Sequence, residues 1–123
     1  MSRTIIDSVD IQGKGVAKID GKVTFVEDAI AGEFVECVIS KKKPSFNNAK
    51  VSSLLRSSPH RVIPQCEYFN RCGGCSMQHM DIGTQVSAKQ RVLEDNFARI
   101  GKIKPGIIFA PIYGNQWAYR RRA

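Results

Sequence analysis

The first half of the chain is patterned as short apolar or alternating runs separated by turn residues. These runs predict strands at Thr4–Ile11, Val16–Ile19, Val23–Val26, Phe34–Ser40 and Ala49–Leu55. Asp20-Gly21 stands between two of them, and Asp-Gly between apolar runs is a strong signal for a two-residue hairpin. Short strands at this spacing are typical of a small barrel of the OB type, which closes its own edges and binds nucleic acid on one face.

Cys37 lies in the strand with the clearest alternation. Residues two apart on a strand share a face, so Cys37 shares one with Val35 and Ile39. A free thiol in such a position behaves as a small buried hydrophobe. We therefore expect Cys37 to belong to the barrel core and not to a reactive or metal site.

The second half has a helical pattern. Val86, Leu93, Phe97 and Ile100 recur on one face of an amphipathic helix that starts near Thr84, packs on the preceding segment and stops at Gly101. Beyond a connector, Trp117–Ala123 reads as the start of a further β-domain, which suggests that the chain is a fragment. The expected divisions are a barrel over 1–57, a linker with cysteines over 58–81, and a helix with the start of another domain over 82–123. The fold class is mainly β with α.

Three of the four cysteines fall between residues 66 and 79, in the stretch C-E-Y-F-N-R-C-G-G-C-S-M-Q-H. Cys72 and Cys75 form a C-x-x-C pair around two glycines, which allow a tight turn. Cys66 stands six residues before Cys72, so three thiols can converge on one centre. This spacing is typical of a metal or iron–sulfur site.

Three interpretations of these thiols remain open on spacing alone. In the first, they are ordinary reduced cysteines or form one disulfide with a spare thiol. In the second, zinc is bound by a complete Cys3His set of Cys66, Cys72, Cys75 and His79. In the third, the thiols hold an iron–sulfur cluster. A cluster of that kind takes a fourth thiolate, and Cys37 is already expected in the core. Spacing therefore favours zinc slightly.

The charge balance indicates an anionic partner. The chain carries 19 basic and 11 acidic residues, a formal net charge of +8. Lysines beside an aromatic ring can combine phosphate contact with base stacking, which favours RNA over a merely solvated loop. The candidate RNA-binding residues are Lys41, Lys42, Lys43, Phe46, Lys50, Arg56, Arg120, Arg121 and Arg122. The N-terminus shows no basic-then-apolar signal sequence, and no apolar run is long enough to span a membrane, so we expect a cytoplasmic protein with reduced thiols and no membrane contact. We also expect a monomer that does not bind DNA.

Several motifs together resemble one enzyme family. They are G-x-G-V-A at 13–17, S-S-P-H-R-V-I-P-Q-C at 57–66, C-G-G-C-S-M-Q-H at 72–79, a helix with Gln85 and Lys89, and W-A-Y-R-R-R-A at 117–123. In this order they are similar to the N-terminal part of bacterial 23S rRNA (uracil-5-)-methyltransferases of the RlmD (RumA) type. The resemblance covers essentially the whole chain.

The resemblance implies a TRAM barrel that contacts RNA, which maps onto residues from about 3 to 57. It also implies a [4Fe–4S] cluster held by Cys66, Cys72 and Cys75, which reverses the slight preference for zinc. In the family, the fourth cluster cysteine, the S-adenosylmethionine site and the catalytic groups lie beyond residue 123. We therefore assign no catalytic residue and expect the isolated chain to be inactive. The alternatives are a stand-alone RNA-binding module with a zinc site and a related tRNA-directed methyltransferase.

Overall fold

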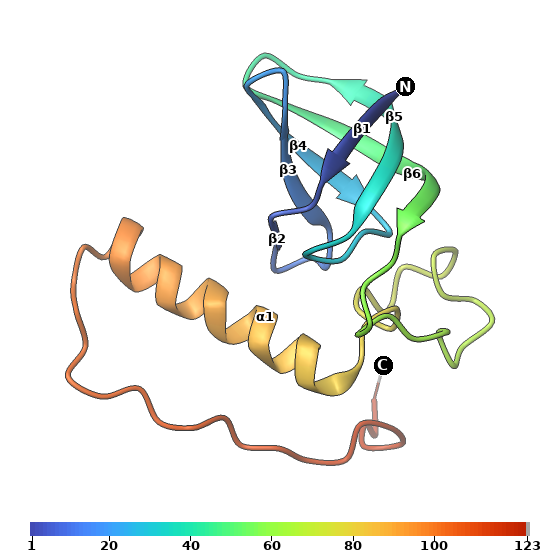
Figure 1. The fold of residues 1–123 in the computed structure, drawn as a ribbon. Helices are drawn as coiled ribbons and strands as arrows, with labels where there is room; N and C mark the ends of the chain where they lie inside the picture. The colour runs from blue at the N-terminus through green and yellow to red at the C-terminus, as the bar shows by residue number, and fades with distance from the viewer. Residues whose placement is uncertain (123) are drawn as a thin grey trace.

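The computed structural model describes residues 1–122 and contains one six-stranded sheet and one long helix (Figure 1). The strands are β1 Ser2–Ile5, β2 Ser8–Val9, β3 Gly15–Ile19, β4 Lys22–Glu27, β5 Phe34–Lys42 and β6 Phe46–Arg56. Their order across the sheet is β1-β5-β6-β4-β3-β2. All neighbours are antiparallel except β4 and β6, which run parallel.

The sheet curls into a small barrel because its two edge strands are consecutive in the chain. β1 pairs with β5, whereas β2 pairs with β3 at the other edge. Between them the N–H of Ile6 donates to the Glu33 carbonyl at 2.9 Å and that of Asp7 to the Val16 carbonyl at 2.8 Å. One bent strand thus joins both edges. This confirms the predicted OB-type barrel.

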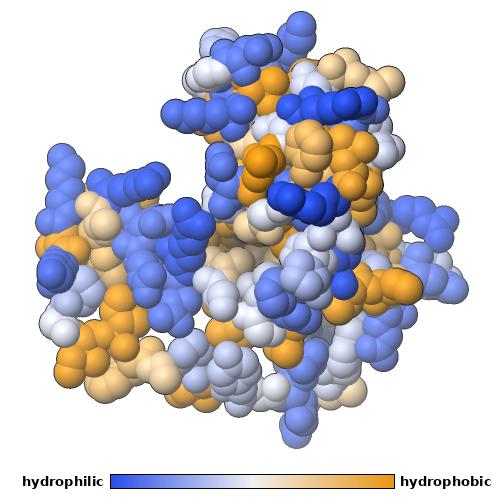
Figure 2. Space-filling view, viewed as in Figure 1, coloured by the Kyte–Doolittle hydropathy of each residue, from blue (hydrophilic) through white to orange (hydrophobic). Residues whose placement is uncertain are grey.

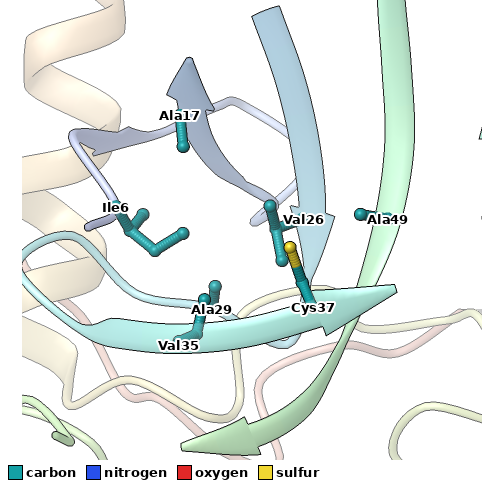
Figure 3. Close-up of a cluster of buried hydrophobic side chains, with 7 residues drawn as sticks. All are labelled: Ile6, Ala17, Val26, Ala29, Val35, Cys37 and Ala49. Atoms are coloured by element: carbon teal, nitrogen blue, oxygen red, sulfur yellow. The ribbon is translucent and has the colours of Figure 1, made fainter. Parts of the chain in front are cut away.

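The barrel core consists of small apolar side chains that point inward from the surrounding strands and loops (Figure 3). Its buried members are Ile6, Ala17, Val26, Ala29, Val35, Cys37 and Ala49. Cys37 is 0% exposed, which confirms its expected place in the core. Burial raises the pKa of its thiol, since the charged thiolate loses its hydration there.

The strand limits differ from the expected ones in two places. The run expected as one strand from Thr4 to Ile11 divides into β1 and β2, because the chain turns there to join the two sheet edges. β5 and β6 are longer than expected, and Lys41 pairs with Asn48 in their antiparallel register. Lys41 and Lys42 therefore belong to a strand, and only residues 43–45 form the connecting loop.

A second apolar cluster joins the barrel to the segment that follows it. Val9 and Ile30 of the barrel pack with Met77 and Met80, and Ala88 of the helix packs against this group. Helix α1 spans Ile82–Asp95, two residues earlier than expected, because the Asp81 carboxylate accepts the Thr84 N–H at 2.8 Å and caps its first turn. A π-helical turn, η1, continues over Asn96–Ile100.

Residues 101–122 form no helix or strand, so the strand expected to begin near Trp117 is not formed. A strand needs a hydrogen-bonded neighbour, and no strand of the described chain lies beside this segment. The predicted apolar helix face is also only partly covered: Leu93 is 45% and Ile100 79% exposed. The terminal segment runs alongside α1 (Figure 1), and apolar side chains gather at the surface in this region (Figure 2).

No helix among the described residues is both long and apolar enough to span a membrane.

Candidate functional site

A partly buried ion pair between Arg61 and Glu33 fixes the cysteine segment to the barrel. Glu33, in the turn before β5, is 0% exposed, and both of its carboxylate oxygens are hydrogen-bonded. Arg61 Nε donates to Oε2 at 2.8 Å and its Nη2 to Oε1 at 2.9 Å, while the N–H groups of Ile30 and Ser58 supply the remaining bonds. Charge-assisted pairs of this two-pronged kind are strong and directional. The first residues after β6 are therefore held against the barrel.

The chain then makes a short antiparallel pairing around the cysteine loop. Arg61 forms an isolated bridge with Met80. The Val62 N–H donates to the His79 carbonyl at 3.0 Å, and the Asp81 N–H donates to the His60 carbonyl at 3.0 Å. These contacts close the base of a loop that spans residues 63 to 78. All three candidate cysteine ligands lie in this loop.

Within the loop the three cysteines lie in irregular backbone. Cys66 is partly buried, whereas Cys72 and Cys75 are exposed, and all three thiols are free. The Cys72 N–H donates to the Tyr68 carbonyl at 2.9 Å, which makes a turn before the C-G-G-C motif. Among residues 1–122, no three His, Cys, Asp or Glu side chains are close enough together to hold a metal ion. The structure places the cysteines in one loop without gathering their sulfur atoms.

The donor chemistry of this loop nevertheless fits a thiolate-bound centre. Three exposed or partly exposed thiols are available, and the backbone around Gly73 is unobstructed, since a methyl group placed on it would meet no atom within 4 Å. Cys37 cannot join them, because it is enclosed in the barrel core. Three thiolates from this chain thus match part of the ligand set that iron–sulfur clusters take from proteins.

His79, the candidate fourth ligand for zinc, is only 3% exposed. Its ring stacks on Phe69 with centroids 5.6 Å apart. Neither ring nitrogen has a hydrogen-bond partner of ordinary geometry in the described chain, although the Ala29 backbone faces the ring. Burial first, and the Arg61 charge second, lower the pKa of His79. The ring is therefore neutral near pH 7, the form in which imidazole binds metals.

A second candidate surface lies on the outside of the barrel. Thr24 and Val26 of β4 point into the core, so Phe25 between them faces outward. Phe46 of β6 lies on the same side and meets Phe25 edge to face, with ring centroids 5.5 Å apart. Strand register and alternation place Lys18, Lys41 and Lys50 around this aromatic pair.

The structure divides the predicted RNA-binding residues into separate groups. Lys41, Phe46 and Lys50 share the outer barrel face, where Lys50 also lies 3.7 Å from Glu27, and Lys42 and Lys43 continue at its end. Arg56 ends β6 at some distance along the strand. The terminal arginines are not on the barrel: Arg120, 5.9 Å above the Tyr119 ring, lines a hollow that also includes Cys75 and Trp117.

Two members of the outer face, Phe25 and Lys18, are absent from the candidates that the sequence supplies. A lone aromatic residue in a short strand usually packs inward, so the pattern alone assigns Phe25 only to a strand. The alternation of Val23–Val26 separates Phe25 from Thr24 and Val26 but does not indicate which of the two faces is buried. The pattern also cannot supply the parallel pairing of β4 with β6, which brings Phe25 to Phe46.

Comparison with known proteins agrees with this architecture. Residues 3–51 match the family model of the TRAM domain. Over all 123 residues the chain is 50% identical to the 23S rRNA (uracil(1939)-C(5))-methyltransferase RlmD of Aromatoleum aromaticum, covering 28% of that protein. It is 52% identical to the RlmD of Thiobacillus denitrificans, over 94% of this chain and 27% of that protein. It is 51% identical to the RlmD of Nitrosospira multiformis, over 97% of this chain and 27% of that protein.

The chain thus spans a little over a quarter of the length of these relatives. The similarity includes the barrel, the cysteine loop and the helix, since it extends across nearly every residue of the chain. Residues 3–51 therefore match the TRAM domain, and the chain is similar along nearly its whole length to one part of the RlmD-type 23S rRNA methyltransferases.

Proposed function

We propose that this chain supplies the RNA-contacting and cluster-holding part of an S-adenosylmethionine-dependent 23S rRNA uracil-C5 methyltransferase. The observation that carries the proposal is the identity of about half of all residues to RlmD proteins, which runs through both the barrel and the cysteine loop. Because the chain spans only part of those proteins, methyl transfer itself is assigned to the longer protein. No residue of this chain is given a catalytic role.

In this proposal the outer barrel face binds single-stranded RNA. Lysine ammonium groups there neutralise phosphates, and the rings of Phe25 and Phe46 offer surfaces on which bases stack. Both rings are partly exposed, which leaves them accessible to a base. The arginines at 120–122 add positive charge on the side of the cysteine loop.

The cysteine loop holds a [4Fe–4S] cluster in this proposal, with Cys66, Cys72 and Cys75 as ligands. Such a cluster would supply a fixed inorganic centre around which the irregular loop is ordered. A fourth thiolate would have to come from another part of the longer protein, because the fourth cysteine of this chain, Cys37, is enclosed in the barrel core. Nothing on the barrel or helix assigns a redox step to it.

A second candidate is an RNA-binding module with a structural zinc ion held by the same cysteines and His79. The buried, unpartnered ring nitrogens of His79 favour it, since a buried polar atom without a partner is costly. Zinc would take three ligands from the loop and the fourth, His79, from the pairing at its base.

The RNA assignment is tested by titrating the chain with a 23S rRNA fragment around uracil 1939, the position in the relatives' names, at several salt concentrations. We expect Lys41→Ala/Lys42→Ala/Lys43→Ala to weaken binding and reduce the slope of log affinity against log salt by about 0.7 for each phosphate that is no longer neutralised. Phe25→Leu and Phe46→Leu should each cost about 1–3 kcal/mol and leave the slope unchanged.

The matched control removes the same number of charges away from the barrel, with Arg99→Ala/Lys102→Ala/Lys104→Ala. It should change affinity much less than the barrel variant. Equal losses in both triple variants would show that the chain attracts RNA by net charge alone. Unchanged affinity in the barrel and phenylalanine variants would exclude this face as the RNA site.

A further inference from the structure

The turn that carries Cys72 and Cys75 is fastened to the barrel just before its first cysteine. The side-chain amide of Asn70 lies 3.2 and 3.3 Å from the two carboxylate oxygens of Asp28, which follows β4. Asn70 and Asp28 both have left-handed backbone, with φ of 75° and 70°. Among residues with a side chain, Asn and Asp adopt this conformation most readily. The Asp28 carbonyl also accepts Arg61 Nη2, so Asp28 holds two parts of the segment.

A second contact fastens the same turn just after Cys75. Gly13 is buried with φ of +81°, and a methyl group on it would overlap the carbonyl oxygen of Ser76. The barrel backbone is therefore packed directly on the backbone of the cysteine loop, at a distance that only glycine permits. Asp10 shapes this barrel turn, because its Oδ1 accepts the N–H groups of Gln12 and Lys14, each at 2.9 Å.

The remaining cysteine is fixed from within the loop. The Cys66 N–H donates to Gln78 Oε1 at 3.1 Å. Gln78 stands between Met77 and His79, both of which are buried. Cys66 is thus tied to the same stretch that Gly13 contacts at Ser76.

Between the two barrel contacts lie residues 71–75, of which the N–H groups of Arg71 and Cys72 donate to the Tyr68 carbonyl at 3.0 and 2.9 Å within the loop. All five are exposed, and Gly73 has φ of +76° with open space around it. Gly74 is close to a single side-chain atom, the Cys72 sulfur, at 3.5 Å from a methyl group placed there. This short turn can change shape without disturbing the barrel.

We propose that Asp28, Asn70 and Gly13 are positioning residues for the thiolate centre. They fix both ends of the turn 71–75 to the barrel, so that the movement needed to bring Cys72 and Cys75 toward Cys66 is confined to this turn. The inference rests on the proposed cysteine centre and adds that the TRAM barrel, which donates no ligand, determines how firmly the centre is held.

The test uses the whole chain, loaded anaerobically with ferric iron and sulfide in the presence of a small thiol, which reduces part of the iron and can occupy the open ligand position. The readouts are iron and sulfide per chain and the rate of iron loss to a chelator. Asn70→Asp places a carboxylate against that of Asp28 while keeping a side chain that tolerates left-handed backbone. We expect iron loss to accelerate about tenfold, the factor for one lost hydrogen bond to a charged group.

The double variant Asp28→Asn/Asn70→Asp exchanges the donor and the acceptor, because the amide at position 28 then faces the carboxylate at position 70. It should restore slow iron loss. The matched control Asp20→Asn alters another turn aspartate with left-handed backbone, φ of 51°, away from the cysteine loop. It should lose iron at the rate of the unmodified chain.

The second contact is tested with a glycine pair. Gly13→Ala and Gly21→Ala both strain left-handed backbone, but only the methyl group at position 13 meets another segment. We expect fast iron loss from Gly13→Ala alone. Circular dichroism and RNA affinity verify that each barrel is folded.

The outcomes separate the two proposals. Equal iron retention in the unmodified chain, Asn70→Asp and folded Gly13→Ala would overturn the positioning role and leave the cysteine centre in place. An unmodified chain that takes up no more iron than Cys72→Ser would overturn the iron–sulfur assignment, and the positioning inference with it. If Asn70→Asp loses iron fast and Asp28→Asn/Asn70→Asp loses it equally fast, the proposed contact between the two side chains would also be contradicted.

Discussion

At the scale of single residues, the four cysteines differ mainly in their surroundings. Cys37 has no exposure and a raised thiol pKa, whereas Cys72 and Cys75 are exposed on a glycine turn. We expect Cys37→Ser to bury a hydroxyl without a partner and to lower the free energy of unfolding by about 1–3 kcal/mol. Metal uptake should be unchanged. Denaturant unfolding and metal analysis check both, and metal loss from Cys37→Ser would contradict the separation of core and loop cysteines.

Glu33 carries a second prediction at this scale. Burial tends to raise its pKa, but the hydrogen bonds from Arg61, Ser58 and Ile30 outweigh burial, and the pKa lies below its ordinary value. Its stabilising effect is therefore complete above the pKa of an unfolded glutamate, about 4.3, and is lost as pH falls through the lower folded pKa. Near pH 7, Glu33→Gln should lower the unfolding free energy by about 3 kcal/mol, since Arg61 loses its charged partner.

The difference between Glu33→Gln and the unmodified chain should shrink in acid, because both then carry a neutral side chain at position 33. Unfolding curves at a series of pH values measure it. Glu27→Gln is the control, since Glu27 makes only an exposed ion pair with Lys50 and should cost about 0–1 kcal/mol. A pH-independent difference would show that Glu33 is not ionised in the folded barrel.

At the scale of elements, helix α1 depends on its N-terminal cap. Hydrogen bonds from Thr84, and then from His60, lower the pKa of Asp81, so the cap is ionised near pH 7. Asp81→Ala should reduce stability by about 1 kcal/mol and speed amide exchange in the first turn of α1. Asp81→Asn keeps a capping oxygen and should lose less. Identical exchange in all three proteins would show that the start of α1 is fixed by packing alone.

Local signals in the sequence predicted some elements well. Asp20-Gly21 indicated the β3–β4 hairpin, and the two-residue period around Cys37 indicated its burial; both are confirmed. The division of the first strand could not be predicted, because it depends on β1 and β2 pairing with different strands. Phe25 was missed as a candidate RNA-binding residue for the same reason, because a parallel pairing between distant segments brings Phe46 to it.

The cysteine loop shows the same limit. Its thiols and glycines were evident from the residues, but its attachment to the barrel was not, since Asp28 and Asn70 are 42 positions apart. The interpretation of Trp117–Ala123 as an entering strand is wrong over the described residues 117–122. The cause is that strand propensity is realised only where a neighbouring strand is present.

At the scale of the whole molecule, the barrel and the segment after it share buried interactions. Glu33 receives bonds from Ser58 and Arg61, and Met77 and Met80 pack with Val9 and Ile30. A chain of residues 1–57 should therefore be less stable than one of residues 1–81, because it lacks the bonds to Glu33 and leaves Val9 and Ile30 exposed to water. Denaturant unfolding of both chains measures the difference. Equal stability would show that the barrel is independent of the cysteine segment.

The central claim is that three sulfur atoms of one loop, beside an RNA-contacting barrel, hold a single [4Fe–4S] centre. The most direct measurement is quantification of iron, acid-labile sulfide and zinc in anaerobically purified chain, compared with Cys72→Ser. We predict iron and sulfide in equal amounts in the unmodified chain and loss of both in the variant. One zinc ion per chain without sulfide, or a metal content unaffected by Cys72→Ser, would contradict the account.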